Sequence, residues 1–286
     1  MDKYSAVWLS HSSISTFKKC PRAYYLSTLY RDPRTGHKLA ITSPAFALGC
    51  AVHEVLESLS ILPVKDRLRT PLLERYRQAW DKYSGQKGGF DNDESEKHYY
   101  EKGVAMINRV SAHPGPLANL AVKIKMDLPH YWLSESDNLI LCGKLDWLEY
   151  LEPEDSIHII DFKTGAGEES VDSLQLPIYY LLAHNCQTKE IKKASYWYVA
   201  RDDMPVEKQL PKLDTCHDLV LKVGKEIKLA RQLERFKCPA GADGCKSCQP
   251  YEKILRGEAT FVGEGDYHTD LYALFEDSST PQSEIL

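Results

Sequence analysis

The sequence predicts a protein of the mixed α/β (α+β) class, because the spacing of its hydrophobic residues changes along the chain. Up to about residue 115 they recur every three or four residues, as on one face of a helix. From Val122 they alternate with polar residues, which is typical of strands. Residues 159–165 read Ile-Ile-Asp-Phe-Lys-Thr-Gly, a short β-branched run that a turn closes. We therefore expect a mixed sheet flanked by helices.

The first part of the chain is predicted to be helical. Ser12 or Ser15 can cap a first helix, which Pro21 interrupts or restarts. A polar loop over 35–43 follows. Apolar residues at helical spacing then predict three helices, over 45–62, 71–83 and 94–111. We interpret residues 45–115 as a helical insertion.

The central part of the chain is predicted to form the sheet. The first three predicted strands cover 122–128, 138–151 and a run that ends at Asp161. Three strands in succession suggest a meander. The elements predicted after them are a helix over 170–184, a strand over 194–200 and a long helix over 215–236.

These elements suggest a single domain over residues 1–260. Its α/β core is expected over 120–205, and residues 206–260 are expected to add a helix and a cysteine cluster. Residues 261–286 are interpreted as a C-terminal tail. Its last dozen residues are polar and are predicted to be disordered.

Charge and hydropathy exclude several classes of protein. The 36 Lys and Arg residues against 41 Asp and Glu residues give a net charge of −5, so any phosphate-binding surface must be local. No apolar run approaches the ~18 residues that span a bilayer, and the first residues do not resemble a secretory signal. We therefore expect a cytoplasmic protein without membrane contact.

Two carboxylates and a lysine stand out in the predicted sheet. Asp161 and Lys163 lie two residues apart, so on an extended backbone they share one face and Phe162 points to the other. Asp146 lies in the preceding predicted strand. A single such aspartate is usually ion-paired or on an edge strand, but two carboxylates in a dry cleft repel each other unless a cation lies between them. A divalent metal with oxygen ligands is therefore predicted here.

Further stretches accompany these acids in a fixed order. They are Gly49–His53 with Glu57, Gly143–Asp146, Asp161–Gly165, Gln175 with Tyr179, and cysteines at both ends of the domain. Together they run from Cys20 to Tyr251 and resemble the PD-(D/E)xK nucleases, in particular the RecB-like branch that includes the CRISPR-adaptation nucleases. The resemblance implies a restriction-endonuclease-like fold and a single RecB-like nuclease domain.

The resemblance also implies roles for individual residues. The implied ligands of a Mg²⁺ or Mn²⁺ ion are His53, Asp146, Asp161 and the main-chain carbonyl of Phe162. Lys163 is expected to orient or help deprotonate the attacking water and to offset charge in the transition state. Gln175 and Tyr179, four residues apart on a helix, are expected to brace Lys163 or contact the DNA backbone. An imidazole ligand favours a softer ion, so Mn²⁺ is expected to work at least as well as Mg²⁺.

Three of the eight cysteines have the spacing of a metal site. Cys245 and Cys248 form a CxxC sequence, and Cys238 lies seven residues earlier. The resemblance supplies Cys20 as a fourth ligand and implies a [4Fe–4S] cluster with a structural role. Many relatives carry another cysteine about six residues after the CxxC, where this chain has Ile254. Zn²⁺ therefore stays an alternative to the cluster.

The implied function is hydrolysis of phosphodiester bonds, with single-stranded DNA or DNA ends as substrate, in CRISPR adaptation or in recombination and repair. Lys18, Lys19 and Arg22, with Tyr24 and Tyr25 nearby, could guide a strand; solvated charge and aromatic core are the equally weighted alternatives. A different possibility is a non-catalytic DNA-binding or adaptor module that joins an integrase or a helicase. A purely structural metal protein would leave the buried acids unexplained.

Overall fold

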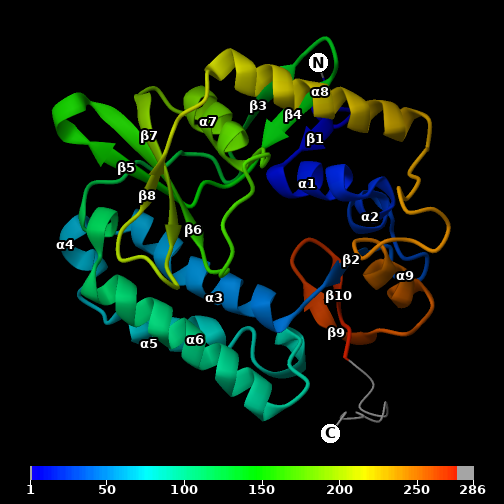
Figure 1. Ribbon diagram of the computed structural model, residues 1–286, viewed down its shortest axis with the longest axis horizontal. Helices are drawn as coiled ribbons and strands as arrows, with labels where there is room; N and C mark the ends of the chain where they lie inside the picture. Colours follow the sequence, from blue (N-terminus) through cyan, green and yellow to red (C-terminus); the bar gives the residue numbers. More distant parts are fainter. Residues whose placement is uncertain (1, 276–286) are drawn as a thin grey trace, which may run out of the picture.

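The computed structural model describes residues 2–275, which form three mixed sheets flanked by helices (Figure 1). The largest sheet has the strand order β5-β6-β7-β8. Its strands are β5 (Trp147–Leu151), β6 (Ser156–Lys163), β7 (Glu190–Tyr198) and β8 (Val206–Lys208). β6 pairs antiparallel with β5 and parallel with β7, which places it inside the sheet. The predicted mixed α/β class is confirmed.

β6 separates two hydrophobic layers because its side chains alternate between the faces of the sheet. Ile160 and Phe162 pack on one face, whereas Ile157 and Ile159 pack on the other. Asp161 continues the second face, and the Lys163 ammonium lies 3.0 Å from its Oδ2 atom. The predicted common orientation of the acid and the lysine, with Phe162 opposite, is confirmed.

The helical segment covers the Phe162 face of the sheet, below the strands in Figure 1. It consists of α3 (Pro44–Ser58), α4 (Val64–Arg67), α5 (Leu72–Trp80) and α6 (Asp93–Ala112). α3 begins where Ser43 Oγ accepts a hydrogen bond from Phe46 N at 3.3 Å, and Asn92 caps α6 in the same way. The predicted helices over 45–62, 71–83 and 94–111 are confirmed with small shifts at their ends.

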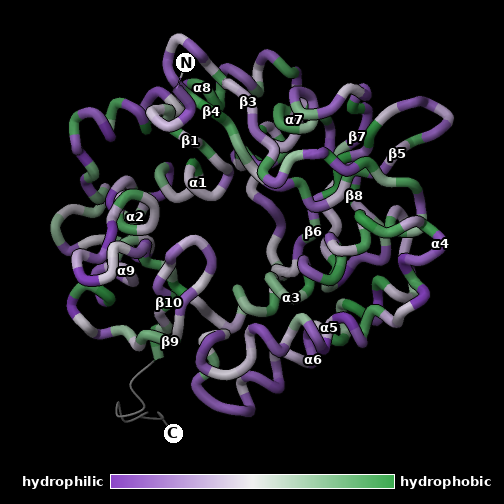
Figure 2. Tube along the Cα trace, turned by 180° about the vertical axis from the view of Figure 1, so that it is seen from behind, coloured by the Kyte–Doolittle hydropathy of each residue, from purple (hydrophilic) through white to green (hydrophobic). Residues whose placement is uncertain are grey.

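The opposite side of the molecule is built from α7 (Gln175–Cys186), α8 (Leu213–Gln232) and a second sheet. This sheet has the order β1-β4-β3, with β1 at Val7–Leu9, β3 at His130–Ser134 and β4 at Leu139–Cys142. Every residue of β4 is apolar and buried, and Figure 2 shows this hydrophobic strand beside α8. The hydrophobic core between this sheet, α7 and α8 is separate from the core between the largest sheet and α3.

A third sheet brings residues 38–41 together with the C-terminal part of the described chain. Its strands are β2 (Lys38–Ile41), β9 (Thr260–Gly265) and β10 (Thr269–Ala273), in the order β2-β10-β9. The helices beside it are α1 (His11–Lys19), α2 (Pro21–Tyr24) and α9 (Gln249–Leu255). Ser10, and not Ser12 or Ser15, caps α1 through a reciprocal pair of hydrogen bonds with Ser13.

Two strand predictions are wrong. Residues 122–128 form no strand. Val122 and Ile124 pack inward, and Val122 N donates a hydrogen bond to Leu148 O of β5 at 2.8 Å, but the pairing stops at an isolated bridge between Ala121 and Glu149. Residues 138–151 form β4 and β5, which belong to different sheets, so the predicted meander is also wrong. The chain crosses between the two sheets at Gly143–Asp146, and alternation alone cannot show such a crossing.

Three further boundaries differ from the prediction. The loop predicted over 35–43 contains β2, because β10 supplies a partner strand. The helix predicted over 170–184 begins only at Gln175. The tail predicted over 261–286 contains most of β9 and all of β10. The predicted disorder of the last dozen residues falls, apart from residue 275, outside the described residues.

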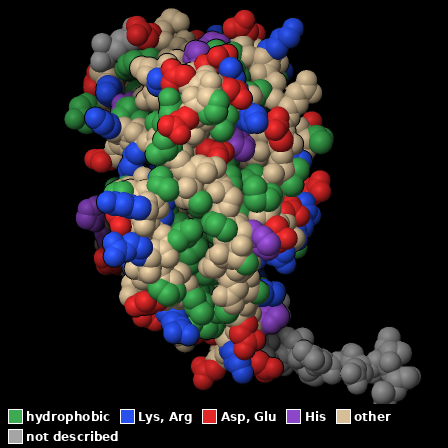
Figure 3. Space-filling model, turned by 90° about the vertical axis from the view of Figure 1, so that its left-hand side faces the viewer, with side chains coloured by type: hydrophobic (Ala, Val, Ile, Leu, Met, Phe, Trp, Pro, Cys, Tyr) green, Lys and Arg blue, Asp and Glu red, His purple; other side chains and the backbone are tan. Residues whose placement is uncertain are grey.

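None of the helices in residues 2–275 is long and apolar enough to cross a membrane. Hydrophobic side chains do reach the surface, and Figure 3 shows a strip of them, bordered by charged side chains, on the side of the molecule that carries α4 and β5. Ile61 and Leu68, which flank α4, are 63% and 40% exposed.

The close packing of α5 and α6 depends on Gly103. A Cβ atom at this position would lie 1.9 Å from Tyr76 Oη, and the Tyr76 ring is fully buried between Trp80 and Tyr100. An unhindered Gly→Ala change inside a helix adds about 0.5–1 kcal/mol of stability. Gly103→Ala is instead expected to lose about 1–3 kcal/mol, because the rigid ring cannot move away. Urea denaturation measures the difference, and Glu101→Ala on the exposed side of α6 serves as the control; a stabilised Gly103→Ala protein would contradict this packing.

Candidate active site

The end of β6 carries a buried cluster of polar side chains. Asp161 is 3% exposed, and its Oδ1 atom accepts a hydrogen bond from Gln175 Nε2 at 2.8 Å. Gln175 Oε1 accepts a hydrogen bond from Lys163 Nζ. One amide therefore bridges the acid and the lysine, and it can do so because α7 begins at Gln175, directly over this face of the sheet.

Asp146 reaches the same place from the crossing between β4 and β5, and not from inside a strand as predicted. Its Oδ2 atom accepts a hydrogen bond from the backbone N–H of Phe162 at 2.9 Å. Phe162 thus contacts this carboxylate through its amide, while the predicted role of its carbonyl stays a prediction. The two aspartates come together although they lie on different segments.

His53 approaches from α3 on the other side of the sheet. Its Nδ1 atom lies 3.0 Å from Glu57 Oε1 and 3.5 Å from Asp146 Oδ2. These three residues offer ligand atoms that all lie within 4.8 Å of one another. The structure therefore brings Glu57 into the group that could hold a metal. Asp161 lies outside this tight group and faces Lys163 and Gln175.

The ionisation of the site follows from burial and crowding. Burial, together with the nearby Asp161 carboxylate, holds the pKa of Asp146 well above its ordinary value. Burial also raises the pKa of Asp161, and Lys163 only partly offsets it. Burial lowers the pKa of His53, but the hydrogen bond to Glu57 and the charge of Asp146 outweigh it and raise the pKa to about 9.

These donors fit a divalent cation. An imidazole nitrogen and carboxylate oxygens are suitable ligands for Mn²⁺ and Mg²⁺. Asp161 Oδ2 is buried and makes no hydrogen bond of ordinary geometry, although Lys163 Nζ lies 3.0 Å away. A cation beside the aspartates would also offset the repulsion that raises the pKa of Asp146.

Two residues near Lys163 had not been predicted. Glu169 Oε2 lies 3.0 Å from Lys163 Nζ, so the lysine is paired with two carboxylates. The only signal in the sequence is an acidic loop after the DxK stretch. Burial lowers the pKa of His11, at the start of α1, to about 4, and the nearby charges of Glu169 and Lys163 have smaller, opposite effects on it. No spacing rule connects His11 to a site so far along the chain.

Tyr179 lies one helical turn beyond Gln175, as its spacing predicts. Its hydroxyl accepts a hydrogen bond from Gln175 Nε2 at 3.3 Å. Burial raises the pKa of Tyr179, so the hydroxyl stays protonated. Tyr179 therefore helps to fix the amide that bridges Asp161 and Lys163, and it has no direct contact with the lysine among the described hydrogen bonds.

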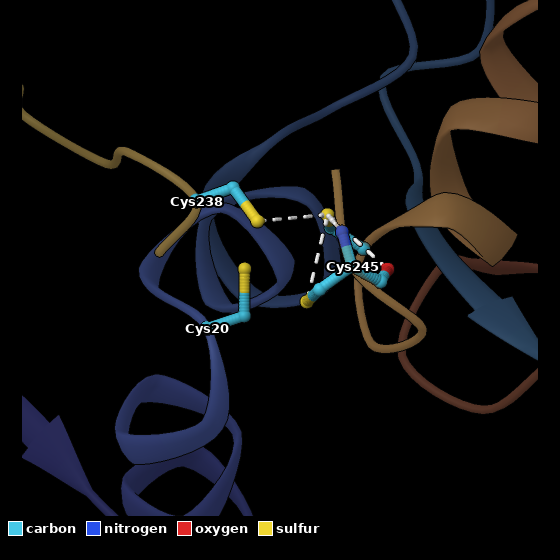
Figure 4. Close-up of side chains that lie close together, drawn as sticks. Cys20, Cys238 and Cys245 are labelled. Carbon is cyan, nitrogen blue, oxygen red and sulfur yellow. Dashed lines mark hydrogen bonds between the residues drawn. The ribbon is translucent and has the colours of Figure 1, made fainter. Parts of the chain in front are cut away.

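The four predicted cysteine ligands form a second candidate metal site. Their sulfur atoms all lie within 4.8 Å of one another, and Figure 4 shows Cys20, Cys238 and Cys245 pointing toward a common centre. Cys248 Sγ lies 3.7 Å from Cys238 Sγ and 3.9 Å from Cys245 Sγ. The N-terminal cysteine and the C-terminal cluster are thus brought together.

The local backbone directs these thiols. Cys20 caps α2, and its sulfur accepts a hydrogen bond from Ala23 N at 3.5 Å. The N–H groups of Ser247 and Cys248 lower the pKa of Cys245 to about 6, whereas burial raises that of Cys20 to about 12. All eight cysteines are free thiols. The chemistry of this donor set, four thiols without a disulfide, fits a metal.

The sequence of the whole site region matches a known family. The family model of the PD-(D/E)XK nuclease superfamily matches residues 8–252. The chain belongs to the PD-(D/E)XK nuclease superfamily. No curated protein matches the chain. Members of this superfamily are generally metal-dependent nucleases, and the acids, the lysine and the cysteine cluster all lie in or beside the matched region.

The basic cluster of this PD-(D/E)XK protein differs from the prediction. Lys18 and Lys19 are exposed, but Arg22 forms an ion pair with Glu252 of α9. Tyr24 is fully buried, so its ring cannot stack on a base and belongs to the aromatic core, which was the alternative. Tyr25 is 38% exposed and is stacked on Phe236. The DNA-binding role of Lys18, Lys19 and Arg22 stays a prediction.

Metal binding at the acidic site can be measured without a substrate. A ligand present at 100 times its dissociation constant stabilises the folded state by about 2.7 kcal/mol. Mn²⁺ is therefore expected to raise the Tm of the parent and not that of Asp146→Asn, which keeps the shape but loses the charge. Without metal, the variant is expected to be at least as stable as the parent, because it removes a buried carboxylate. Asp203→Asn, at the surface, is the control; a Tm rise in Asp146→Asn equal to the parent's would exclude Asp146 as a ligand.

Proposed function

We propose that the protein is a divalent-metal-dependent deoxyribonuclease that hydrolyses phosphodiester bonds. The observation that carries the proposal is the convergence of two groups at the end of β6. One group is His53, Glu57 and Asp146, whose ligand atoms lie within 4.8 Å. The other is Asp161 with Lys163, whose charged atoms are 3.0 Å apart and are bridged by an amide.

The proposed ligands are His53, Asp146 and Asp161, with Glu57 added because it shares the same group. The ion, Mn²⁺ or Mg²⁺, would supply polarisation of the scissile phosphate and activation of water. Asp146 is held in place by the Phe162 amide and Asp161 by Gln175. These neutral N–H donors support the carboxylate form of both acids.

Lys163 is proposed to stabilise negative charge on the phosphate during the reaction. Its ammonium is held by Asp161 and Glu169, each at 3.0 Å, which keeps it cationic and fixed in position. This arrangement favours charge stabilisation over removal of a proton from water, because a base must first lose its own proton. Gln175 and Tyr179 position Lys163 and Asp161 and need not contact DNA.

Single-stranded DNA or DNA ends are the proposed substrate, and CRISPR adaptation or recombination and repair the proposed setting. The order of the motifs from Cys20 to Tyr251, which resembles the RecB-like branch, supports this choice. An integrase or a helicase is the proposed partner. A cytoplasmic location is proposed from the eight free thiols, since such a set is typical of a reducing compartment.

A non-catalytic DNA-binding or adaptor module is the alternative function. It would need the fold and the cysteine site but not the acids. The buried carboxylates argue against it, because burying Asp146 and Asp161 side by side costs stability and an adaptor module would have no use for them.

We propose that the cysteine site holds a structural metal. One tetrahedral ion with metal–sulfur distances of 2.3 Å sets its sulfurs about 3.8 Å apart. The distances of 3.7 and 3.9 Å around Cys248 support Zn²⁺ on this measure. The resemblance supports a [4Fe–4S] cluster, in which each cysteine binds a different iron and the cluster itself spreads the sulfurs further apart. Metal analysis distinguishes one zinc from four irons.

The structural role predicts the effect of losing one ligand. Cys245→Ser is expected to lose the bound metal and about 2 kcal/mol or more of stability, which lowers the Tm by roughly 4–8 °C. Cys186→Ser, outside the cluster, is the control. Metal content by mass spectrometry and thermal denaturation check both parts. A metal-free parent with the stability of Cys245→Ser would refute the metal site.

The catalytic proposal predicts a loss of cleavage without a loss of fold. Asp161→Ala and Lys163→Met are expected to lower the rate on labelled DNA with Mn²⁺ by about 10²-fold or more, because each removes charge next to the phosphate. Lys189→Ala, whose ammonium pairs with Asp155 at the surface, is the matched control. Single-stranded and double-stranded substrates are compared. Cleavage that survives both changes, or no cleavage by the parent, would refute the nuclease function.

A further inference from the structure

Asp146 and Glu57 open onto a groove of about 920 Å³. One wall is the C-terminal half of α3 with the residues just after it, and the other is formed by residues 122–129. Tyr267, at the tip of the β9–β10 hairpin, also lines this groove. We name it the α3 groove. It connects the candidate metal site with a segment more than a hundred residues away in the chain.

The walls of the α3 groove carry unpaired positive charge. Its three lysines, Lys123, Lys125 and Lys144, are exposed, and none forms an ion pair with another residue of the described chain. The inward packing of Val122 and Ile124 is what turns the first two lysines outward.

The groove also contains four carboxylates, those of Glu54, Glu57, Asp127 and Asp146. Glu54 is paired with Lys82, and Glu57 and Asp146 lie beside His53. Asp127 stands among the lysines of the facing wall. The acids near His53 are those that a divalent ion would neutralise, which leaves the lysines as the charges available to phosphates.

Tyr267 is an unusual residue for its position. Its side chain is 89% exposed, and its φ of 57° lies in the left-handed region, as does the φ of 53° at His268. Hairpin turns that need such angles normally use Asn, Asp or Gly, because a bulky side chain costs stability there. A tyrosine held at this cost, with its ring at the edge of a groove, indicates a binding role.

We propose that Tyr267 is a base-stacking residue for single-stranded DNA in the α3 groove. This proposal rests on the proposed nuclease function and names part of the surface that holds the substrate. The exposed ring offers a flat face to a base, and the lysines face the phosphates, which is how proteins bind single strands without reading their sequence. A duplex offers no such base, since its internal bases are already stacked on both sides.

The proposal is tested by binding of a short labelled oligothymidylate, measured by fluorescence anisotropy with Ca²⁺ in place of Mn²⁺. Tyr267→Asn removes the ring with a residue that tolerates the left-handed backbone, and Tyr267→Phe keeps the ring. Tyr4→Asn removes a tyrosine that is 99% exposed and lies outside the groove. Circular dichroism confirms that each variant is folded.

Tyr267→Asn is expected to weaken binding of the single strand by about 5-fold or more. Tyr267→Phe and Tyr4→Asn are expected to bind like the parent. Competition by a covalently closed circular duplex, which has no terminal base pair, is expected to be unchanged in all variants. An abasic nucleotide moved along the strand is expected to weaken binding at one position in the parent. At that position it should have no effect in Tyr267→Asn, because the stacking partner is already gone.

Binding by Tyr267→Asn equal to the parent's would overturn the stacking, and so would an equal loss on the duplex. Cleavage with Mn²⁺ is measured on the same proteins. A parent that cleaves DNA but shows no effect of Tyr267→Asn overturns the stacking alone. A parent that neither binds nor cleaves DNA overturns both the stacking and the nuclease function.

Discussion

The structure is organised around the electrostatic cost of burying two carboxylates side by side. Asp146 is 9% exposed and Asp161 is 3% exposed. Burial raises the pKa of both, and the Asp161 charge raises that of Asp146 further. The groups that reduce this cost come from three elements: the Phe162 amide and the Lys163 ammonium from β6, the Gln175 amide from α7 and the His53 imidazole from α3. The two acids can therefore coexist only where these three elements meet.

This requirement explains the two hydrophobic layers around β6. α3 must pack on the Phe162 face for His53 to reach Asp146, and α7 must pack on the opposite face for Gln175 to reach Asp161. The chain between them is long because α4, α5 and α6 complete the first layer before the sheet begins. The helical segment thus positions the proposed ligands His53 and Glu57, and α4, α5 and α6 need take no part in the chemistry.

The parts of the fold that could be predicted from the sequence are those with local causes. The DxK stretch fixes the faces of Asp161 and Lys163 through strand geometry, and helical spacing relates Gln175 to Tyr179. The predictions that failed depend on contacts between segments that lie far apart in the chain. β2 exists because β10 pairs with it from the C-terminal part of the chain. Residues 122–128 form no strand despite their alternation, because their pairing with β5 stops at one isolated bridge. Glu169 reaches the site from the loop after β6, and the spacing of residues does not predict the path of a loop.

Contacts between the N-terminal and C-terminal regions of the chain link the cysteine site to the α3 groove. Cys20 and the C-terminal cysteines lie together, the Arg22–Glu252 ion pair joins α2 to α9, and β2 pairs in parallel with β10. β10 forms the hairpin with β9 that carries Tyr267 to the α3 groove. Under the proposed function, a metal held by the cysteines would therefore help to fix the hairpin that carries Tyr267, while taking no part in hydrolysis. Under that proposal, the metal would affect DNA binding through strand pairing and not by contact with the substrate.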